Sequence, residues 1–418
     1  MPKIKIVGKN TLSGEICVEG AKNSAVALIP AAILCDEEVK LGNVPNISDI
    51  DSLEEILSYL NVKVTRGDHE VTIDAKDIKN DDIACNLSNK LRASYYFMGA
   101  LLGRYKYVKM CFPGGCSIGE RPINLHLKGF EKLGAVIEEN DGEFVIHADE
   151  LIGDEIFLDI PSVGATINII LASVKAKGET IIENAAMEPE IVDVCNCLNS
   201  MGAKIKGVGT GRLEITGVSY LHSCEHSVVP DRIEAGTYVI MASLLGKNLK
   251  ITNLNPLHIE SLTSKLEEAG VKLEIGEDYV LCKKVREYNA IDITTMVYPG
   301  FPTDLQQPMV PFLVSCNGTS HIEETIWENR FMNIPDTVKM GASIEINDDN
   351  TIATIYGKRN LIGKEVVSTD LRGGASMVIC GLIADGTTIV DNIEHILRGY
   401  EDIVGKLKNV GADIEIID

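Results

Sequence analysis

One short phrase recurs six times along the chain, and its regular spacing constrains the fold more than any other feature. A typical copy is Met201-Gly202-Ala203-Lys204-Ile205. Counted from Asn61 to Gly411, the spacings are 73, 68, 68, 71 and 70 residues. A fixed period over a whole chain is typical of one supersecondary unit used repeatedly. The central residues of the copies are Asn61, Gly134, Gly202, Gly270, Gly341 and Gly411.

The repeat predicts two kinds of helix. An amphipathic helix ends at the central glycine, which suits a left-handed C-terminal cap, and two alternating strands follow it. A second helix is apolar nearly all round and leads into a further strand. An amphipathic helix covers a surface and an all-apolar helix is buried, so we call these the outer and inner helices. The predicted inner helices are 24–34, 94–102, 166–177, 235–245, 305–316 and 376–385.

The length of 418 residues exceeds one ordinary core, so two domains of three repeats each are expected. The hydrophobic content of 45% predicts that the whole chain folds. No apolar run reaches the roughly 18 residues that cross a bilayer. The N-terminus alternates like a strand and has no signal-peptide core, which predicts a cytoplasmic protein.

The eleven cysteines are scattered without a C-x-x-C pair, which argues against a disulfide framework and against structural zinc. Most of them are expected to be small buried apolar residues. Cys195 with Cys197, and His222 with Cys224 and His226, match no known ligand spacing. We predict no metal.

The net charge of −22 disfavours a nucleic-acid partner, which needs a basic face. The cations instead gather at predicted helix starts, where they oppose the helix dipole and make poor caps. Together they predict an anionic ligand. For Asp231, Asp304 and Asp370, helix capping alone stays an open alternative. The cations are Lys22, Arg92, Arg121, Arg330, Arg372 and Arg398.

One loop breaks the repeat, at residues 113–122. Three glycines and two prolines in ten residues predict a long exposed segment. Cys116 lies five residues before Arg121 and close to a helix start, a setting that lowers a thiol pKa. A nucleophile, an acid–base group and a silent exposed cysteine all stay open for Cys116.

Further segments match one family, in order, over the whole chain. On them the chain resembles the UDP-N-acetylglucosamine 1-carboxyvinyltransferases, bacterial enolpyruvyl transferases of peptidoglycan synthesis. The Cys116 loop is highly specific to that family. The matching segments are Ala21-Lys22-Asn23, 113–122, 162–166, 183–186, 188–190, 230–234, Phe301-Pro302-Thr303-Asp304, Glu328-Asn329-Arg330-Phe331, Thr369-Asp370-Leu371-Arg372 and Arg398-Gly399-Tyr400-Glu401.

The resemblance implies an α/β fold of two domains, an inside-out α/β barrel of six βαβαββ-type repeats with three repeats around buried helices in each domain. Residues 1–21 and 230–418 are expected to form the catalytic domain. Residues 22–229 are expected to form the second domain, with Lys22 and the Cys116 loop. The active site is then expected in the cleft between the domains.

The implied reaction transfers the enolpyruvyl group of phosphoenolpyruvate to the 3-hydroxyl of UDP-N-acetylglucosamine by addition and elimination, with release of phosphate. It needs no cofactor and no metal. The expected partners are these two small molecules, with no nucleic acid and no membrane, and a regulatory protein partner is left open.

The resemblance also implies roles for single residues. Cys116, Asp304, Lys22 and Asp370 are the expected catalytic residues. Asp304 takes the proton of the sugar hydroxyl, and Cys116 matches the thiol that fosfomycin alkylates. Lys22, Arg121 and Arg398 match the phosphoenolpyruvate cations. Asp231, Glu328, Arg330 and Arg372 match the supporting network. The expected sugar-nucleotide contacts are Asn23, Arg92, Arg121, Pro122, Ile123, Asn124, Leu125, Ser162, Val163, Gly164, Asp304 and Ile326.

Two positions depart from the family pattern on the nucleotide side, where Ile160 replaces a common lysine and Asn124 a common aspartate. They leave the uridine contacts open. The alternatives are a transferase like 5-enolpyruvylshikimate-3-phosphate synthase, which lacks the Cys116 loop, and a catalytically silent sugar-nucleotide-binding regulator.

Overall fold

The computed structural model describes residues 2–111, 123–140, 142–283 and 285–418. They form two compact units, each with its own hydrophobic core. Unit 1 comprises residues 2–19 and 230–418, and unit 2 comprises residues 20–111 and 123–229. A catalytic site between two domains stays a prediction.

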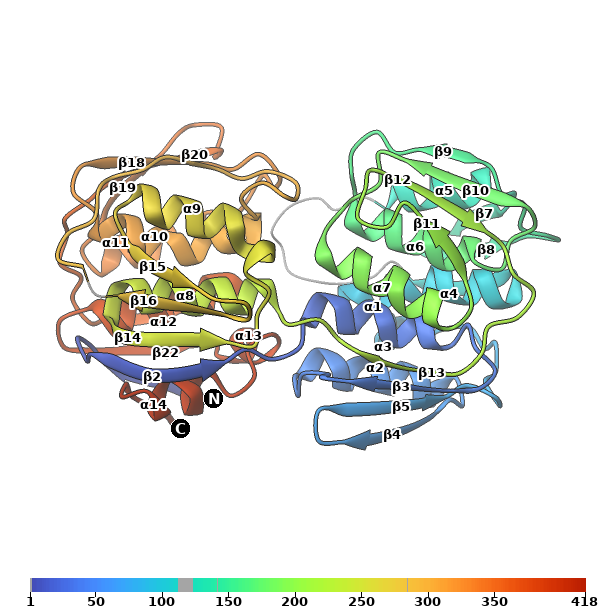
Figure 1. Ribbon diagram of the computed structural model, residues 1–418, viewed down its shortest axis with the longest axis horizontal. Helices are drawn as coiled ribbons and strands as arrows, with labels where there is room; N and C mark the ends of the chain where they lie inside the picture. Colours follow the sequence, from blue (N-terminus) through green and yellow to red (C-terminus); the bar gives the residue numbers. More distant parts are fainter. Residues whose placement is uncertain (1, 112–122, 141, 284) are drawn as a thin grey trace. The chain divides into compact units, whose positions relative to one another are not determined.

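Six inner helices are present, three in each unit, and nearly all of their residues are buried. In unit 2, α4 packs against α1 and α6, and in unit 1, α8, α10 and α12 pack against one another. Figure 1 shows strands around the outside of each unit and these helices within it. The inner helices are α1 (Lys22–Ala32), α4 (Tyr96–Tyr105), α6 (Val163–Ser173), α8 (Arg232–Leu245), α10 (Gln306–Ser315) and α12 (Leu371–Ile383).

The sequence predicted these helices correctly but misplaced several of their starts. The largest error is at α12, which was predicted from residue 376 and begins at Leu371. Its first turn holds Arg372, Gly373 and Gly374, which carry no apolar periodicity, and glycine is a poor helix former. The N-cap Asp370 is what starts this helix.

The outer helices end as the repeat predicted. The residue that follows the C-cap of each helix is in the left-handed region, with φ between 92° and 110° at the five glycines and 61° at Asn61. Glycine and asparagine adopt this conformation more readily than other residues, so the recurring phrase marks a helix end. The outer helices are α2 (Ser48–Tyr59), α5 (Asn124–Lys132), α7 (Pro189–Ser200), α9 (Glu260–Glu268), α11 (Ile334–Lys339) and α14 (Ile403–Asn409).

The strands of unit 2 form three open sheets with the orders β13-β3-β5-β4, β6-β8-β7 and β11-β12-β10-β9. In the first sheet β13 runs parallel to β3, with Cys224 opposite Val39. The strands are β3 (Glu38–Gly42), β4 (Lys63–Gly67), β5 (Glu70–Asp74), β6 (Tyr107–Cys111), β7 (Val136–Asn140), β8 (Glu143–His147), β9 (Glu155–Phe157), β10 (Glu179–Glu183), β11 (Lys204–Lys206), β12 (Arg212–Thr216) and β13 (Cys224–Ser227).

The strands of unit 1 form three four-stranded sheets with the orders β15-β16-β14-β2, β17-β18-β20-β19 and β21-β22-β1-β23. The strands are β1 (Lys3–Val7), β2 (Leu12–Cys17), β14 (Gly246–Thr252), β15 (Lys272–Ile275), β16 (Tyr279–Lys283), β17 (Ile293–Thr294), β18 (Thr319–Glu323), β19 (Ser343–Ile346), β20 (Ile352–Tyr356), β21 (Glu365–Val367), β22 (Thr387–Asp391) and β23 (Asp413–Ile417).

The N-terminal strands complete two sheets of unit 1. β1 lies between β22 and β23, antiparallel to both, and Ile4 faces Val390 on one side and Ile416 on the other. β2 runs parallel to β14, with Ile16 opposite Ile251. Strands more than 200 residues apart in sequence therefore pair in the same sheet.

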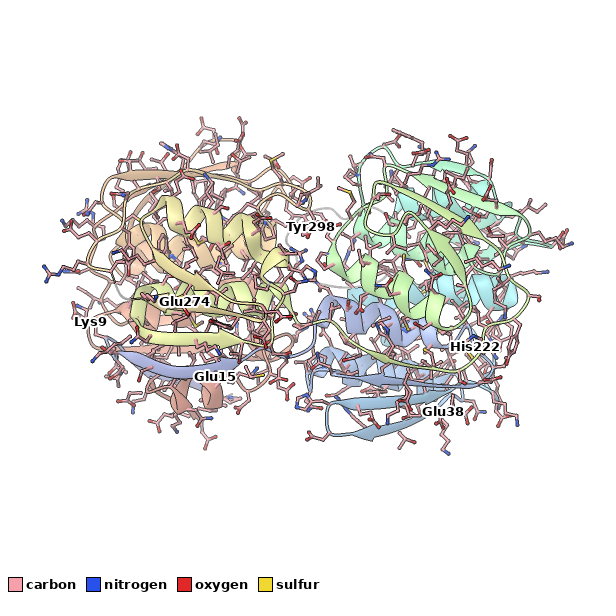
Figure 2. The ribbon with its side chains drawn as sticks, in the orientation of Figure 1. Lys9, Glu15, Glu38, His222, Glu274 and Tyr298 are labelled. Atoms are coloured by element: carbon pink, nitrogen blue, oxygen red, sulfur yellow. A yellow bond between two sulfur atoms is a disulfide. The ribbon has the colours of Figure 1, made fainter. Side chains whose placement is uncertain are left out.

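The remaining elements are short. They are α3 (Cys85–Ser88), α13 (Glu394–Leu397), and the 3-10 helices η1 (Arg92–Tyr95), η2 (Pro256–Ile259) and η3 (Thr303–Leu305). Acidic side chains such as Glu15, Glu38 and Glu274 lie on the exposed faces of strands (Figure 2). None of the described helices has both the length and the apolar character needed to cross a membrane.

Candidate active site

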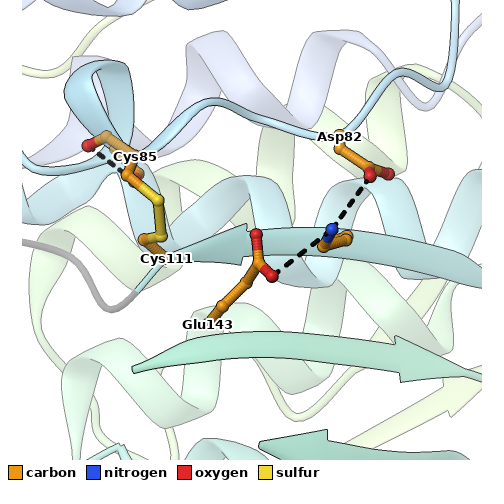
Figure 3. The surroundings of a disulfide bond; sticks show 6 residues. Asp82, Cys85, Cys111 and Glu143 are labelled. Atoms are coloured by element: carbon orange, nitrogen blue, oxygen red, sulfur yellow. Dashed lines mark hydrogen bonds and ion pairs between the residues drawn. A yellow bond between two sulfur atoms is a disulfide. The ribbon is translucent and has the colours of Figure 1, made fainter. Parts of the chain in front are cut away.

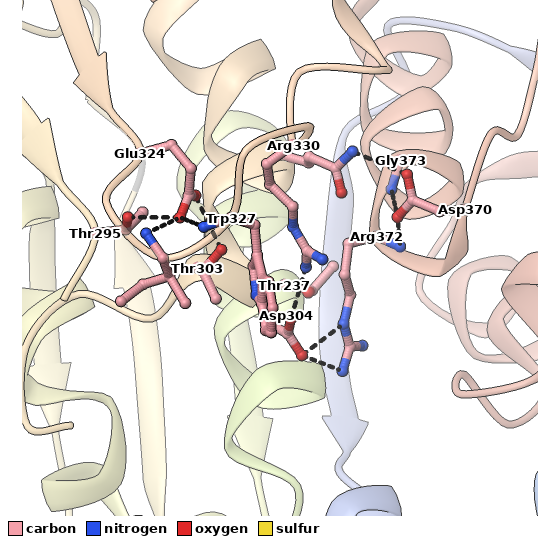
Figure 4. Close-up of polar contacts among 12 residues, drawn as sticks. Thr237, Thr295, Thr303, Asp304, Glu324, Trp327, Arg330, Asp370, Arg372 and Gly373 are labelled. Atoms are coloured by element: carbon pink, nitrogen blue, oxygen red, sulfur yellow. Dashed lines mark hydrogen bonds and ion pairs between the residues drawn. The ribbon is translucent and has the colours of Figure 1, made fainter. Parts of the chain in front are cut away.

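Asp304 lies in η3, directly before the inner helix α10 of unit 1, and two arginines hold its carboxylate (Figure 4). The Arg330 Nη2 donates to Oδ1 at 2.6 Å, and the Arg372 Nη2 and Nε lie 3.2 Å and 3.3 Å from Oδ2. Charge-assisted contacts of this kind are strong and directional, so they fix the orientation of the carboxylate. The Asp304 side chain stays 29% exposed.

Both arginines are buried, with side-chain exposures of 2% for Arg330 and 4% for Arg372. Burial lowers the pKa of Arg372, but Tyr400, Asp304 and Asp231 outweigh burial and raise this pKa above its ordinary value. Within the described residues, Arg330 Nε and Arg372 Nη1 have no hydrogen-bond partner. Buried donors without partners are costly, so this group is suited to a further acceptor such as an anionic ligand.

The other two aspartates cap helices, and their predicted roles toward ligands stay predictions. The Asp231 carboxylate accepts from the backbone N–H of Ile233 and Glu234 at the start of α8. The Asp370 carboxylate accepts from the N–H of Arg372 and Gly373 at the start of α12. Asp304 instead accepts from the guanidinium groups of Arg330 and Arg372.

The cap at Asp370 also connects to the Asp304 site. Gln307 Nε2 and Thr369 Oγ1 donate to its second oxygen at 3.0 Å and 3.2 Å. Arg372 follows two residues later and stacks over the Tyr400 ring, 5.3 Å from its centroid. The Tyr400 hydroxyl lies 3.0 Å from Thr237 Oγ1 on α8. The structure thus brings together Asp304, Arg330, Arg372 and Asp370.

The other predicted residues of unit 1 lie in loops. Ile326 and Glu328 belong to the segment between β18 and α11, where Ile326 is half-buried and Glu328 is exposed. Arg398 is half-buried and follows α13. Their predicted roles toward ligands stay predictions.

In unit 2, Lys22 is the first residue of α1, and its Nζ lies 2.8 Å from Asp49 Oδ2 on α2. The two side chains are 15% and 4% exposed. Sequence reasoning missed Asp49, because an acidic residue in the first turn of a helix is ordinary. Asn23 follows Lys22 and is half-buried.

A second group in unit 2 surrounds the start of α6. Ser162 is its N-cap and accepts from Ala165 N at 3.3 Å, and Val163 follows. A Cβ on Gly164 would lie 2.9 Å from both Tyr95 Oη and His126 Cε1, so a larger residue there would displace one of these rings. Arg92 lies over the Tyr95 ring at 5.9 Å, and burial lowers its pKa.

His126 is a member of this group that sequence reasoning missed. Its Nδ1 lies 2.9 Å from Asn168 Nδ2, and Asn168 Oδ1 accepts from Gly99 N at 2.8 Å. The Gly99 contact orients the amide, so Asn168 donates to Nδ1 and the imidazole proton is on Nε2. Burial, with a smaller effect of Arg92, lowers the pKa of His126 to about 3. The signal in sequence was a histidine in the first turn of an outer helix.

The other nucleotide-side predictions fall at the start of α5. Ile123 and Leu125 are buried and Asn124 is exposed, while Ile160 is 63% exposed. Cys116, Arg121 and Pro122 lie outside the described residues, so their predicted roles stay predictions.

One disulfide is present although the sequence argued against a disulfide framework, and most of the cysteines that the structure describes are buried, as expected. Cys85 in α3 is bonded to Cys111 at the end of β6 (Figure 3). Beside the pair, Lys109 Nζ lies 3.3 Å from both Asp82 Oδ2 and Glu143 Oε2. The separation of 26 residues does not predict that these two cysteines pair, because the bond forms only where α3 packs against β6.

The cysteine and histidine candidates of α7 and β13 lie in structural settings. Cys195 and Cys197 are buried in α7, as expected of small apolar residues. His226 Nε2 lies 2.7 Å from Asp193 Oδ1, and Asp193 Oδ2 accepts from Val229 N at 3.3 Å. These contacts join α7 to β13 and to the segment that follows it.

Comparison with known proteins identifies the family. The profile of the family EPSP synthase (3-phosphoshikimate 1-carboxyvinyltransferase) matches residues 6–407. A Bacillus cereus UDP-N-acetylglucosamine 1-carboxyvinyltransferase 2 is 50% identical over 415 residues, which cover 99% of this chain and 96% of that protein. A Staphylococcus aureus protein with the same name is 50% identical over 412 residues, 98% of both chains.

Solved structures agree on the fold. The enolpyruvyl transferase NikO from Streptomyces tendae matches with a TM-score of 0.90 and 25% identity, covering 99% of this chain and 98% of that one. An EPSP synthase from Acinetobacter baumannii matches all of both chains with a TM-score of 0.76 and 18% identity, which shows the fold alone. The chain therefore belongs to the EPSP synthase family of enolpyruvyl transferases and, within it, to the UDP-N-acetylglucosamine 1-carboxyvinyltransferases.

Proposed function

We propose that this chain transfers the enolpyruvyl group of phosphoenolpyruvate to the 3-hydroxyl of UDP-N-acetylglucosamine, the first committed step of peptidoglycan synthesis. The observation that carries the proposal is the Asp304 carboxylate held between two buried arginines. Relatives that are 50% identical over nearly the whole chain bear the name of this activity. A cytoplasmic location is part of the proposal.

Asp304 is proposed as the base for the sugar hydroxyl. Arg330 donates to one carboxylate oxygen and Arg372 to the other, which fixes the carboxylate in one orientation, and the side chain is partly exposed. The hydroxyl proton passes to Asp304 as its oxygen forms a bond to C2 of phosphoenolpyruvate and C3 gains a proton. Loss of a proton from C3 and of phosphate from C2 then gives the enolpyruvyl ether.

The remaining roles are proposed from the resemblance. Lys22, Arg121 and Arg398 bind the phosphate and carboxylate of phosphoenolpyruvate, and Cys116 supplies the loop thiol. Arg330 and Arg372 stabilise negative charge that develops near Asp304. Burial of both guanidinium groups strengthens this effect, because a site that excludes water screens charge less.

Phosphate release tests the proposal. We expect the purified chain to release phosphate only when both phosphoenolpyruvate and UDP-N-acetylglucosamine are present. Asp304→Asn keeps the shape of the side chain and should lower kcat by about 10²–10⁴-fold while sugar-nucleotide binding, measured by calorimetry, changes little.

Three outcomes would contradict parts of this proposal. Release with shikimate 3-phosphate in place of the sugar nucleotide would favour a shikimate-type transferase. Sugar-nucleotide binding with no release would favour a silent regulator. Near-normal turnover of Asp304→Asn would remove Asp304 from the role of base.

A further inference from the structure

Glu324 occupies a position that holds an asparagine in four other repeats. Each asparagine directly follows the strand after an inner helix and has a left-handed backbone, with φ between 54° and 57°. Three of the asparagines donate through Nδ2 to the carbonyl that follows the neighbouring parallel strand, at Val228, Leu158 and Val18. The four asparagines are Asn43, Asn184, Asn253 and Asn392.

In the repeat that carries Asp304, Glu324 reverses this hydrogen bond. Glu324 follows β18, and its Oε1 accepts from Thr295 Oγ1 at 2.9 Å, where Thr295 follows the parallel strand β17. Those three asparagines donate a hydrogen bond to the end of the neighbouring parallel strand, whereas Glu324 accepts one from it. An anchor between two strands needs only the asparagine, so the carboxylate requires a further explanation.

Glu324 accepts three more hydrogen bonds. The backbone N–H of Ile326 and of Trp327 donate to Oε1 at 2.9 Å and 3.2 Å. The Thr303 hydroxyl donates to Oε2 at 2.9 Å. Glu324 is 2% exposed and, within the described part of the chain, forms no ion pair. A buried carboxylate with four neutral donors is held in one position.

Each of the donor segments leads into one partner of the Asp304–Arg330 contact (Figure 4). Thr303 directly precedes Asp304 in η3, and Ile326 and Trp327 begin the segment that leads to Arg330. The Glu324 carboxylate thus joins the backbone that carries Asp304 to the segment that carries its arginine partner. A displacement of either segment would change the 2.6 Å contact between Arg330 Nη2 and Asp304 Oδ1.

We propose that Glu324 is a positioning residue for the enolpyruvyl transfer: through Thr303 and the Ile326 and Trp327 amides it holds Asp304 and Arg330 in the geometry for proton removal. The inference rests on the proposed function of Asp304. It predicts an effect on turnover that exceeds the effect on substrate binding, since a misplaced reacting group costs rate.

Thr303→Val tests the connection directly, because valine keeps the shape of threonine and removes only the hydroxyl. We expect kcat to fall roughly 10- to 100-fold, with KM for both substrates changed by less than about threefold. Thr303→Ser keeps the hydroxyl and should restore most of the turnover. Glu324→Gln should lower kcat in the same way, because an amide has one acceptor oxygen in place of two.

The same substitutions in the Asp304→Asn background distinguish a positioning role through Asp304 from a disturbance of the fold that lowers activity in another way. If Glu324 acts through Asp304, then Thr303→Val and Glu324→Gln should change the residual rate of Asp304→Asn by less than about twofold. Asn253→Asp is the matched control, because it alters the equivalent anchor in the neighbouring repeat. It should lower the unfolding temperature and leave kcat of the folded protein unchanged.

A normal kcat in folded Thr303→Val would overturn the inference. It would also be overturned if Thr303→Val or Glu324→Gln lowered kcat by the same factor in the Asp304→Asn background as in the wild type. Near-normal turnover of Asp304→Asn alone would overturn it as well, while phosphate release by the wild type would still support the proposed reaction. No phosphate release by the wild type would refute both proposals. The wild-type assay therefore distinguishes the two failures.

Discussion

The chemistry of a carboxylate at a helix start depends on which donors reach it. Asp231 and Asp370 accept from backbone N–H groups and therefore stabilise α8 and α12. Asp304 accepts from two arginine side chains and stays partly exposed. All three lie in motifs that resemble the same family, but only for Asp304 do the contacts support a role as base.

His126 gives a prediction for pH dependence at the scale of one residue. Its pKa is about 3 in the folded protein, and the ordinary value is 6.5. Below pH 6.5 the unfolded chain binds a proton that the folded protein does not bind until about pH 3. The stability contributed by neutral His126 is thus complete above pH 6.5 and is lost as pH falls toward 3.

We expect the unfolding free energy of the wild type to fall by about 2 kcal/mol more than that of His126→Gln between pH 7 and pH 5. Urea unfolding of both proteins at several pH values measures this difference. If the unfolding free energies of the two proteins fell equally with pH, the assignment of a buried neutral imidazole would be contradicted.

At the scale of the element, the close approach of α4 and α6 depends on two glycines one turn apart. A Cβ on Gly99 would lie 2.4 Å from Asn168 O, and a Cβ on Gly103 would lie 2.4 Å from Leu171 O. Both obstacles are backbone atoms of the facing helix, which move only if the helix moves. The same contact orients Asn168 toward His126.

Gly99→Ala should therefore lower the unfolding free energy by about 1–3 kcal/mol, because the added methyl separates two packed helices. Gly42→Ala, at the end of β3, is the control, since its Cβ would meet nothing within 4 Å. We expect Gly42→Ala to change stability by less than about 0.5 kcal/mol. Equal effects of the two substitutions in urea unfolding would show that helix packing is not the cause.

At the scale of the whole molecule, carboxylates already balance several of the cations that the sequence singled out. Cations that gather at a site for an anionic ligand repel one another unless carboxylates balance them. Arg330 and Arg372 are paired with Asp304, and Lys22 is paired with Asp49. Mutual repulsion of unpaired cations therefore does not describe these three residues.

Residues proposed to bind the sugar nucleotide come from both units, with Arg92 and Ser162 in unit 2 and Asp304 and Ile326 in unit 1. A ligand that binds only the folded form stabilises it by about 2.7 kcal/mol at a hundred times its Kd. With UDP-N-acetylglucosamine at that concentration, we expect slower amide hydrogen exchange near residue 162 and near residue 304. Phosphoenolpyruvate alone is the control. Protection confined to one unit would contradict the assignment.

The sequence by itself determined the repeat, the buried helices and the family. These features depend on local chemistry: an apolar helix is buried wherever it lies, and glycine or asparagine at a helix end adopts a left-handed conformation. Asp304 and its arginines could be named from their motifs, which are contiguous in sequence.

Only the tertiary structure decided which groups meet. The Cys85–Cys111 bond, the Lys22–Asp49 pair and the four donors of Glu324 join residues from different elements. β1 lies between β22 and β23, although nearly the whole length of the chain separates β1 from these two strands. Such contacts depend on how helices and strands pack, and a period of about 70 residues predicts the elements that pack but not the side chains that come together.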